Sequence, residues 1–98
     1  MCGVCGIMLR RPDAIVNPRA VIRDAANSLK SRGPDGTNTW SEDRVHFGHT
    51  RLAVIDREGG RQPMVSAASD CVLVYNGEIY NFIELRRELT SKGRQFRT

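Results

Sequence analysis

The sequence predicts one small α+β domain in which helices pack on an antiparallel sheet. Two segments have apolar residues at helical spacing, and four other short segments are rich in β-branched or aromatic residues. These segments follow one another as strand, helix, strands, helix, an order that favours helices on an antiparallel sheet over alternating βαβ units. The chain has 98 residues, enough for one modest core but too few for two domains.

The first two elements have clear boundaries in the sequence. Residues 4–9 form an apolar run between a glycine and an arginine, which predicts a short buried strand. The pair Asn17-Pro18 is a helix-start signal, and the pair Gly33-Pro34 stops the helical pattern. We therefore expect the first helix over about residues 18–31.

The later elements are shorter. Strands are expected around Val45 and Phe47, over residues 52–55 and over residues 72–75, each bounded by glycine or charge. A second helix should begin after Asn81, which would form an N-cap pair with Glu84, and it should end at Gly93.

Cys2 follows Met1 directly, so removal of one residue would leave a thiol and a free α-amine on the same residue. A free α-amine titrates near ~7.7 to 8.0 and an ordinary thiol near ~8.5, so an N-terminal amine can take up a thiol proton at neutral pH. This arrangement is a recognised form of nucleophilic catalysis. A cysteine at the second position is more often incidental, so the interpretation depends on the rest of the chain.

Four further segments accompany the opening Met-Cys-Gly: residues 32–36 (RGPDG), 48–56 (GHTRLAVID), 60–64 (GRQPM) and 75–81 (YNGEIYN). In this order and spacing, the five segments resemble the glutaminase domain of asparagine synthetases. That domain is a class II glutamine amidotransferase of the N-terminal-nucleophile hydrolases. The resemblance covers nearly the whole chain and implies the four-layer αββα sandwich of those hydrolases. Residues 1–98 would then be the N-terminal portion of a type 2 glutamine amidotransferase domain, roughly its first half, with no synthetase domain.

The resemblance also implies a role for each site residue. Cys2 would attack the glutamine side-chain amide to form a γ-glutamyl thioester, and its amine would return the proton to the departing ammonia. The side-chain amide of Asn76 and the N–H of Gly77 would form the oxyanion hole. A guanidinium can hold the substrate α-carboxylate through two parallel hydrogen bonds, and Glu78 would lie beside the substrate ammonium. The implied substrate-binding residues are Arg51, Leu52, Ala53, Val54, Ile55, Asn76, Gly77 and Glu78.

Three of these motifs also have simpler interpretations from the residues alone. An Asn-Gly pair such as Asn76-Gly77 is typical of a type I′ hairpin turn, which is compatible with an oxyanion site. Residues 32–36 contain a Pro-Asp-Gly turn, to which we assign a structural role. His49 is also interpreted as structural, because Cys2 would carry its own base.

The expected partners are L-glutamine and a synthetase domain or subunit that uses the ammonia, with aspartate as the default acceptor. ATP and Mg²⁺ belong to that synthetase, and no cofactor is expected in this chain, which lacks a P-loop and a Ser-Gly-Gly-Xaa-Asp segment. The alternative is a truncated, non-catalytic amidotransferase fragment. Half of a sandwich would expose a sheet face and strand edges, which predicts marginal stability or a homo-oligomer.

A competing hypothesis is a small structural zinc module. Cys2 and Cys5 form Cys-x-x-Cys, and His46 and His49 form His-x-x-His. The gap between the pairs is about forty residues, much longer than the roughly 12 to 15 of a zinc finger, and the cysteines lie in an apolar strand. We therefore expect no metal site and interpret Cys5 as a small hydrophobic residue.

Composition excludes other function classes. The net charge of +4 comes from scattered arginines without an aromatic-interleaved patch, so no nucleic acid is expected. No apolar run approaches the ~18 residues of a membrane span, which argues against a membrane partner. Three cysteines without a signal peptide favour reduced thiols and a cytoplasmic protein.

Overall fold

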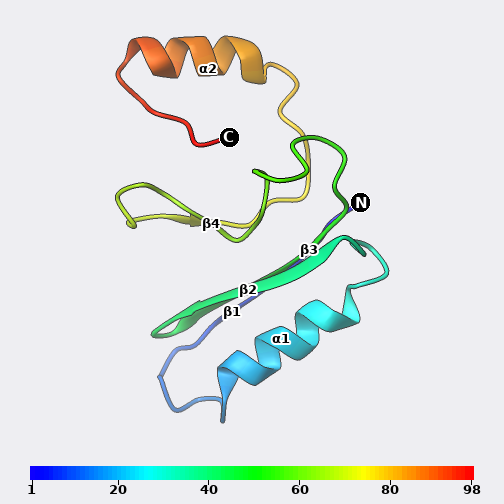
Figure 1. Ribbon diagram of the computed structural model, residues 1–98. Helices are drawn as coiled ribbons and strands as arrows, with labels where there is room; N and C mark the ends of the chain where they lie inside the picture. The colour runs from blue at the N-terminus through cyan, green and yellow to red at the C-terminus, as the bar shows by residue number, and fades with distance from the viewer.

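The computed structural model describes residues 1–98 and contains two antiparallel sheets and two helices (Figure 1). The three-stranded sheet has the order β1-β3-β2, and the second sheet pairs β4 with β5. This arrangement confirms the predicted α+β class with antiparallel strands. The elements are β1 (Gly3–Met8), α1 (Pro18–Ser28), β2 (Gly36–Glu42), β3 (Val45–Arg51), β4 (Met64–Val65), β5 (Val72–Leu73) and α2 (Phe82–Ser91).

Strand β3 is the centre of the larger sheet, and α1 covers one face of that sheet (Figure 1). A β-carbon added to Gly48 would lie 2.9 Å from the β-carbon of Ala26, so the helix packs directly on the backbone of β3. Since side chains alternate along a strand, His46 and Thr50 also face α1. His49 points to the opposite face, the side of the sheet on which the chain after β3 lies (Figure 1).

Helix α1 begins where the sequence predicted. Asn17 has a left-handed backbone with φ 52°, and its side chain accepts a hydrogen bond from the N–H of Ala20 at 3.2 Å. Ile22 and Ala26 are fully buried against the sheet. The helix ends at Ser28, three residues before the predicted end, although the chain continues in turns to the glycine that stops it.

Strand β2 was not predicted, because its segment Gly-Thr-Asn-Thr-Trp-Ser-Glu is mainly polar. It forms through a tight hairpin with β3 in which Asp43 has a positive φ of 45°. The indole of Trp40 stacks on Phe47 with ring centroids 6.0 Å apart, which secures the pairing on one face. The two-residue strand β4 was also missed, for lack of any alternating pattern.

The strand predicted over residues 52–55 is wrong, because this segment is a loop. The N–H of Leu52 is directed to the sulfur of Cys2, and the N–H of Ala53 is directed to a carboxylate oxygen of Asp35. Since two successive amides bind side chains, they form no ladder with a neighbouring strand. The strand predicted over residues 72–75 is shorter than expected and ends at Leu73.

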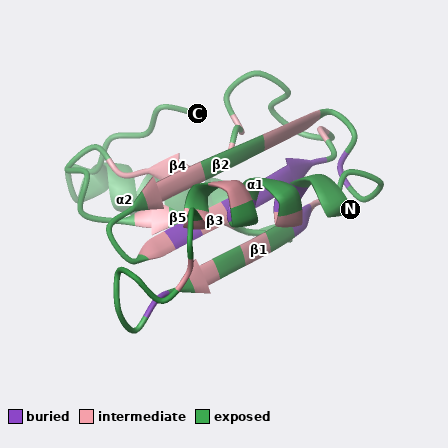
Figure 2. Ribbon diagram, turned by 90° about the horizontal axis from the view of Figure 1, so that it is seen from below, coloured by how far each residue is buried: buried purple, intermediate pink, exposed green.

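Helix α2 begins after Asn81 as predicted, but the Asn81 side chain makes no capping hydrogen bond, so the proposed N-cap pair is wrong. The helix packs against no other helix or strand, and Figure 2 shows it exposed along its length. Its apolar side chains Phe82, Ile83, Leu85 and Leu89 are all exposed. Neither helix is of a length and hydrophobicity that would let it traverse a bilayer.

The hydrophobic core is small. Only 10 of the 98 residues are buried, and the apolar ones with side chains larger than glycine are Leu9, Ile22 and Ala26. The radius of gyration is 15.0 Å, whereas a compact domain of this length has about 13 Å. Because little apolar surface leaves water, we expect a low free energy of unfolding for these residues alone.

Candidate active site

Cys2 lies immediately before β1, and its half-buried thiol is bonded to the backbone. The N–H of Leu52 donates to the sulfur at 3.3 Å, and the thiol faces the carbonyl oxygen of the same residue at 3.7 Å. The carbonyl oxygen of Cys2 accepts a longer bond, 3.4 Å, from Nε of Arg32. The predicted nucleophile therefore lies beside Leu52, the first residue of the loop over residues 52–55, which are predicted to bind substrate.

Residues 32–36 hold that loop in place, in keeping with their predicted structural role. A carboxylate oxygen of Asp35 accepts from the N–H of Ala53 at 2.8 Å, and the N–H of Asp35 donates to the carbonyl of Arg51 at 2.9 Å. A β-carbon added to Gly33 would lie 2.3 Å from the carbonyl carbon of Thr50, so only glycine fits there. Val54 and Ile55 complete the loop with exposed side chains.

Arg51 is buried, with 8% of its surface exposed, and its guanidinium binds the loop that follows it. It donates to the carbonyl oxygens of Arg57 at 2.7 Å, of Ile55 at 3.1 Å and of Asp56. These bonds leave the Nε–H and one Nη1–H without a protein partner. The predicted role in carboxylate binding stays a prediction, and it could use only these remaining donors unless the loop moves.

The segment with Asn76, Gly77 and Glu78 follows β5. The N–H of the preceding Tyr75 donates to the side-chain oxygen of Gln62 at 2.5 Å. Asn76 is half-buried, the two residues after it are exposed, and no hydrogen bond connects the three with Cys2. Neither Asn76 nor Gly77 has a positive φ, so the type I′ turn considered for this pair is wrong.

His49 is 1% exposed, and neither ring nitrogen has a hydrogen-bond partner. Burial lowers its pKa from the usual 6.5; the Tyr75 backbone beside the ring partly offsets this effect, and the charge of Arg51 adds to it. An enclosed, neutral ring without a polar partner fits the structural interpretation of His49.

The four residues of the zinc hypothesis do not converge. Cys5 and His46 face α1, whereas His49 points to the opposite face of the same sheet. No group of three His, Cys, Asp or Glu side chains is arranged to hold a metal ion. Cys5 is half-buried; burial raises the pKa of its thiol, and the Gly48 backbone partly offsets this shift.

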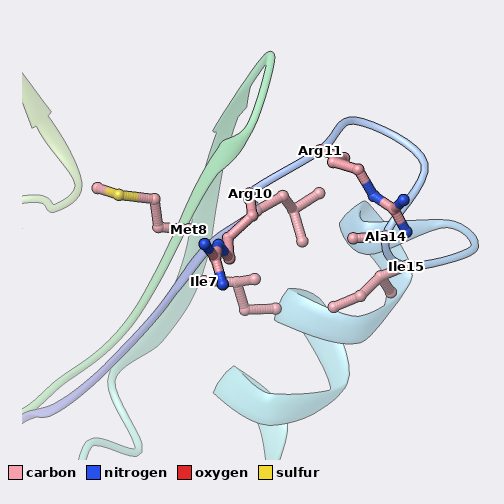
Figure 3. A pocket seen from close by; sticks show the side chains of 7 residues that line it. Ile7, Met8, Arg10, Arg11, Ala14 and Ile15 are labelled. Atoms are coloured by element: carbon pink, nitrogen blue, oxygen red, sulfur yellow. The ribbon is translucent and has the colours of Figure 1, made fainter.

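A surface hollow lies at the end of β1 opposite to Cys2. It is lined by apolar residues and two arginines on both sides of the turn that leads to α1; Ile7 points toward the helix and Met8 away from it (Figure 3). The hollow contains none of the predicted site residues, so it has no bearing on the chemistry at Cys2.

Two residues near the site had no role assigned from the sequence. Thr50 binds the backbone of Gly3, and Gln62 binds the backbone just before Asn76. Both residues lie inside the motifs that carry the family resemblance, and this position is the signal in the sequence that could have identified them. Their partners are backbone groups far away in the sequence, and no local pattern identifies such contacts.

Comparison with known proteins agrees with these motifs. Residues 1–98 match the family described as glutamine amidotransferase domain. The chain is 43% identical over 98 residues to asparagine synthetase [glutamine-hydrolyzing] 3 of Bacillus subtilis and 38% identical over 99 residues to asparagine synthetase 1 of that organism. It is 36% identical over 98 residues to asparagine synthetase 1 of Arabidopsis thaliana. The matches cover 98 to 100% of this chain but only 16% of each relative. The protein therefore belongs to the glutamine amidotransferase domain family.

Proposed function

We propose that this protein hydrolyses the side-chain amide of L-glutamine, with Cys2 as the N-terminal nucleophile after removal of Met1. The observation that carries the proposal is the position of the Cys2 thiol, which accepts a hydrogen bond from the N–H of Leu52 at 3.3 Å. This contact joins the nucleophile to the loop that should bind glutamine, in a chain of the amidotransferase family.

The proposed reaction has two halves. The α-amine of Cys2 takes the thiol proton, and the sulfur attacks the amide carbon to give a tetrahedral intermediate. The C–N bond then breaks, the amine returns the proton to the nitrogen, and ammonia leaves a γ-glutamyl thioester. Water attacks the thioester, the C–S bond breaks, and glutamate is released with the thiol restored.

Other residues stabilise the substrate in this proposal. Asn76 and Gly77 supply the oxyanion donors, each worth about 3 kcal/mol in acyl transfer. Arg51 offers one free N–H to the α-carboxylate, because Nε–H and the free Nη1–H lie on different edges of the guanidinium, and Glu78 faces the ammonium.

The relatives suggest where the ammonia goes. They are named glutamine-hydrolysing asparagine synthetases, and this chain spans 16% of their length. We propose that residues 1–98 form the N-terminal portion of an amidotransferase domain with the αββα architecture. A synthetase domain or subunit, which would use ATP and Mg²⁺, would transfer the ammonia to aspartate.

The test is the intact mass of the protein after brief exposure to 6-diazo-5-oxo-L-norleucine, an electrophile that mimics glutamine. We expect one adduct on a chain that lacks Met1, and no adduct on Cys2→Ala. Cys71→Ala is the matched control, because Cys71 is an exposed thiol far along the chain and its removal should leave the adduct in place. An adduct that disappears with Cys71 instead would contradict the proposal.

A second candidate is a non-catalytic amidotransferase fragment. Helix α2 packs against no other helix or strand, and this favours the second candidate. A folded protein without Met1 that forms no adduct would support this candidate. A monomer that melts in two states and turns over glutamine rapidly would exclude it.

A further inference from the structure

One hydroxyl group joins three elements beside the proposed nucleophile. Thr50 is fully buried in β3, and its Oγ1 accepts a hydrogen bond from the N–H of Gly3 in β1 at 3.1 Å. The same Oγ1 donates to the carbonyl oxygen of Leu29 at the end of α1, also at 3.1 Å. Because donor and acceptor functions are both used, the hydroxyl has one orientation.

The N–H that Thr50 binds belongs to the peptide unit between Cys2 and Gly3. A peptide unit is planar, so an anchor at its N–H restricts the position of the Cα of Cys2, which bears the amine and the side chain with the thiol. The carbonyl oxygen of the same unit accepts only the longer 3.4 Å bond from Arg32. The bond to Thr50 is therefore shorter and more deeply buried than the bond to Arg32.

The glycine after the nucleophile makes this contact possible. A β-carbon at Gly3 would lie 2.6 Å from Oγ1 of Thr50 and 2.9 Å from the β-carbon of Leu29. Any side chain would therefore displace the hydroxyl from the backbone of Gly3. The close approach that requires glycine at this position is therefore that of Thr50 and Leu29.

We propose that Thr50 is a positioning residue for the glutaminase reaction. It sets the position of Cys2 through the Cys2–Gly3 peptide and touches neither the thiol nor the substrate. The inference rests on the proposed role of Cys2 as nucleophile. A misplacement of about 1 Å at a reacting group can cost on the order of a hundredfold in rate, so an anchor of this kind has a measurable effect.

Two substitutions separate the hydroxyl from the shape of the side chain. Thr50→Val keeps the branched shape and loses both hydrogen bonds, whereas Thr50→Ser keeps the hydroxyl. We expect the amide of Gly3 to exchange with solvent roughly tenfold faster or more in Thr50→Val but not in Thr50→Ser, as follows from loss of one buried hydrogen bond. The amide of Leu9 bonds to the carbonyl of Arg44 at the other end of β1 and should not change, so it controls for general unfolding.

The kinetic readout is inactivation by 6-diazo-5-oxo-L-norleucine. Thr50→Val should lower the maximal inactivation rate about tenfold and leave the half-saturating concentration within about twofold, because the nucleophile is misplaced while the substrate loop is intact. Thr50→Ser should restore most of the rate. Equal exchange at Gly3 in both variants, a parallel rise at Gly3 and Leu9, or equal inactivation rates would overturn the inference. Failure of the proposed function would look different, because the wild-type protein itself would form no adduct.

Discussion

The amide N–H of Leu52 donates a hydrogen bond to the sulfur of Cys2 across 3.3 Å, between two residues that lie 50 positions apart. A donor at this position stabilises negative charge on sulfur, and hydrogen bonds to charged groups contribute about 1.5 to 3 kcal/mol. Leu52→Pro removes the N–H and should slow alkylation of Cys2 by iodoacetamide roughly tenfold, as measured by site-resolved mass spectrometry.

The matched variant for this prediction is Leu52→Ala, which keeps the N–H and shortens an exposed side chain. Its alkylation rate at Cys2 should stay within about twofold of the wild type, because the contact is made by the backbone. If the alanine variant reacts as slowly as the proline variant, the side chain and not the amide controls the thiol.

Gly33 offers a purely steric prediction. A β-carbon there would lie 2.3 Å from the carbonyl carbon of Thr50 and 2.4 Å from the nitrogen of Arg51, both backbone atoms of the central strand. Backbone atoms in a paired strand cannot move aside easily, so Gly33→Ala should lower the free energy of unfolding by about 3 kcal/mol. Urea denaturation at constant m-value measures the change.

Gly36 is the control for that substitution, because a β-carbon there meets no atom within 4 Å and its φ is not positive. Gly36→Ala should change stability by less than about 1 kcal/mol, and an increase is expected from the lower entropy of the unfolded chain. Similar losses in the two variants would mean that the contact at Gly33 is not what matters.

Elements that depend on neighbouring residues could be predicted from the sequence, and those that depend on distant partners could not. Helix α1 was predictable because Asn17 and Pro18 act on their immediate neighbours. The apolar run over residues 52–55 resembled a strand, yet its first two amides bind the side chains of Cys2 and Asp35, which lie 50 and 18 positions away in the sequence. Local propensity contains no information about such distant partners.

The contacts within the candidate site were also not predictable. The motifs identified Arg51 and Asn76 as site residues by resemblance, but they did not identify the groups that hold these residues in place. Arg51 is held by the carbonyls of its own loop, and the amide before Asn76 is held by Gln62. These contacts depend on how the loops fold back on β3, which a pattern of residue types does not record.

Arg51 should stabilise the protein even without substrate. Its guanidinium is almost completely buried and binds the carbonyls of Ile55, Asp56 and Arg57. A lysine ammonium cannot reproduce this planar set of donors, so Arg51→Lys should lower the free energy of unfolding by about 2 kcal/mol in the absence of glutamine. Urea denaturation measures the loss, and the exchange rate of the Gly60 amide, which bonds to Asp56, reports on the loop.

Arg61→Lys is the comparison for this change, because Arg61 is exposed and makes no hydrogen bond or salt bridge. It should alter stability by less than about 0.5 kcal/mol. If Arg51→Lys unfolds at the same urea concentration as Arg61→Lys, the three carbonyl contacts contribute nothing, and substrate binding would be the only role left for Arg51.

His49 predicts how stability depends on pH. Its folded-state pKa lies below the usual 6.5, first because the ring is buried, and further because of the charge of Arg51 on the same sheet face. Above pH 6.5 the ring is neutral in both states, and its contribution to stability is complete. As the pH falls below 6.5, the unfolded chain binds a proton that the folded protein resists, so stability decreases until the pH reaches the lower folded-state pKa.

The measurement is the difference between wild type and His49→Gln in urea denaturation from pH 8 to pH 5. The glutamine side chain takes up no proton, so the stability of His49→Gln should fall less steeply between pH 6.5 and pH 5 than that of the wild type. The slope against pH is the readout, and it does not depend on how much the substitution changes absolute stability. Parallel curves for the two proteins would show that the ring takes up its proton as readily in the folded state as in the unfolded chain, and that His49 is not enclosed in solution.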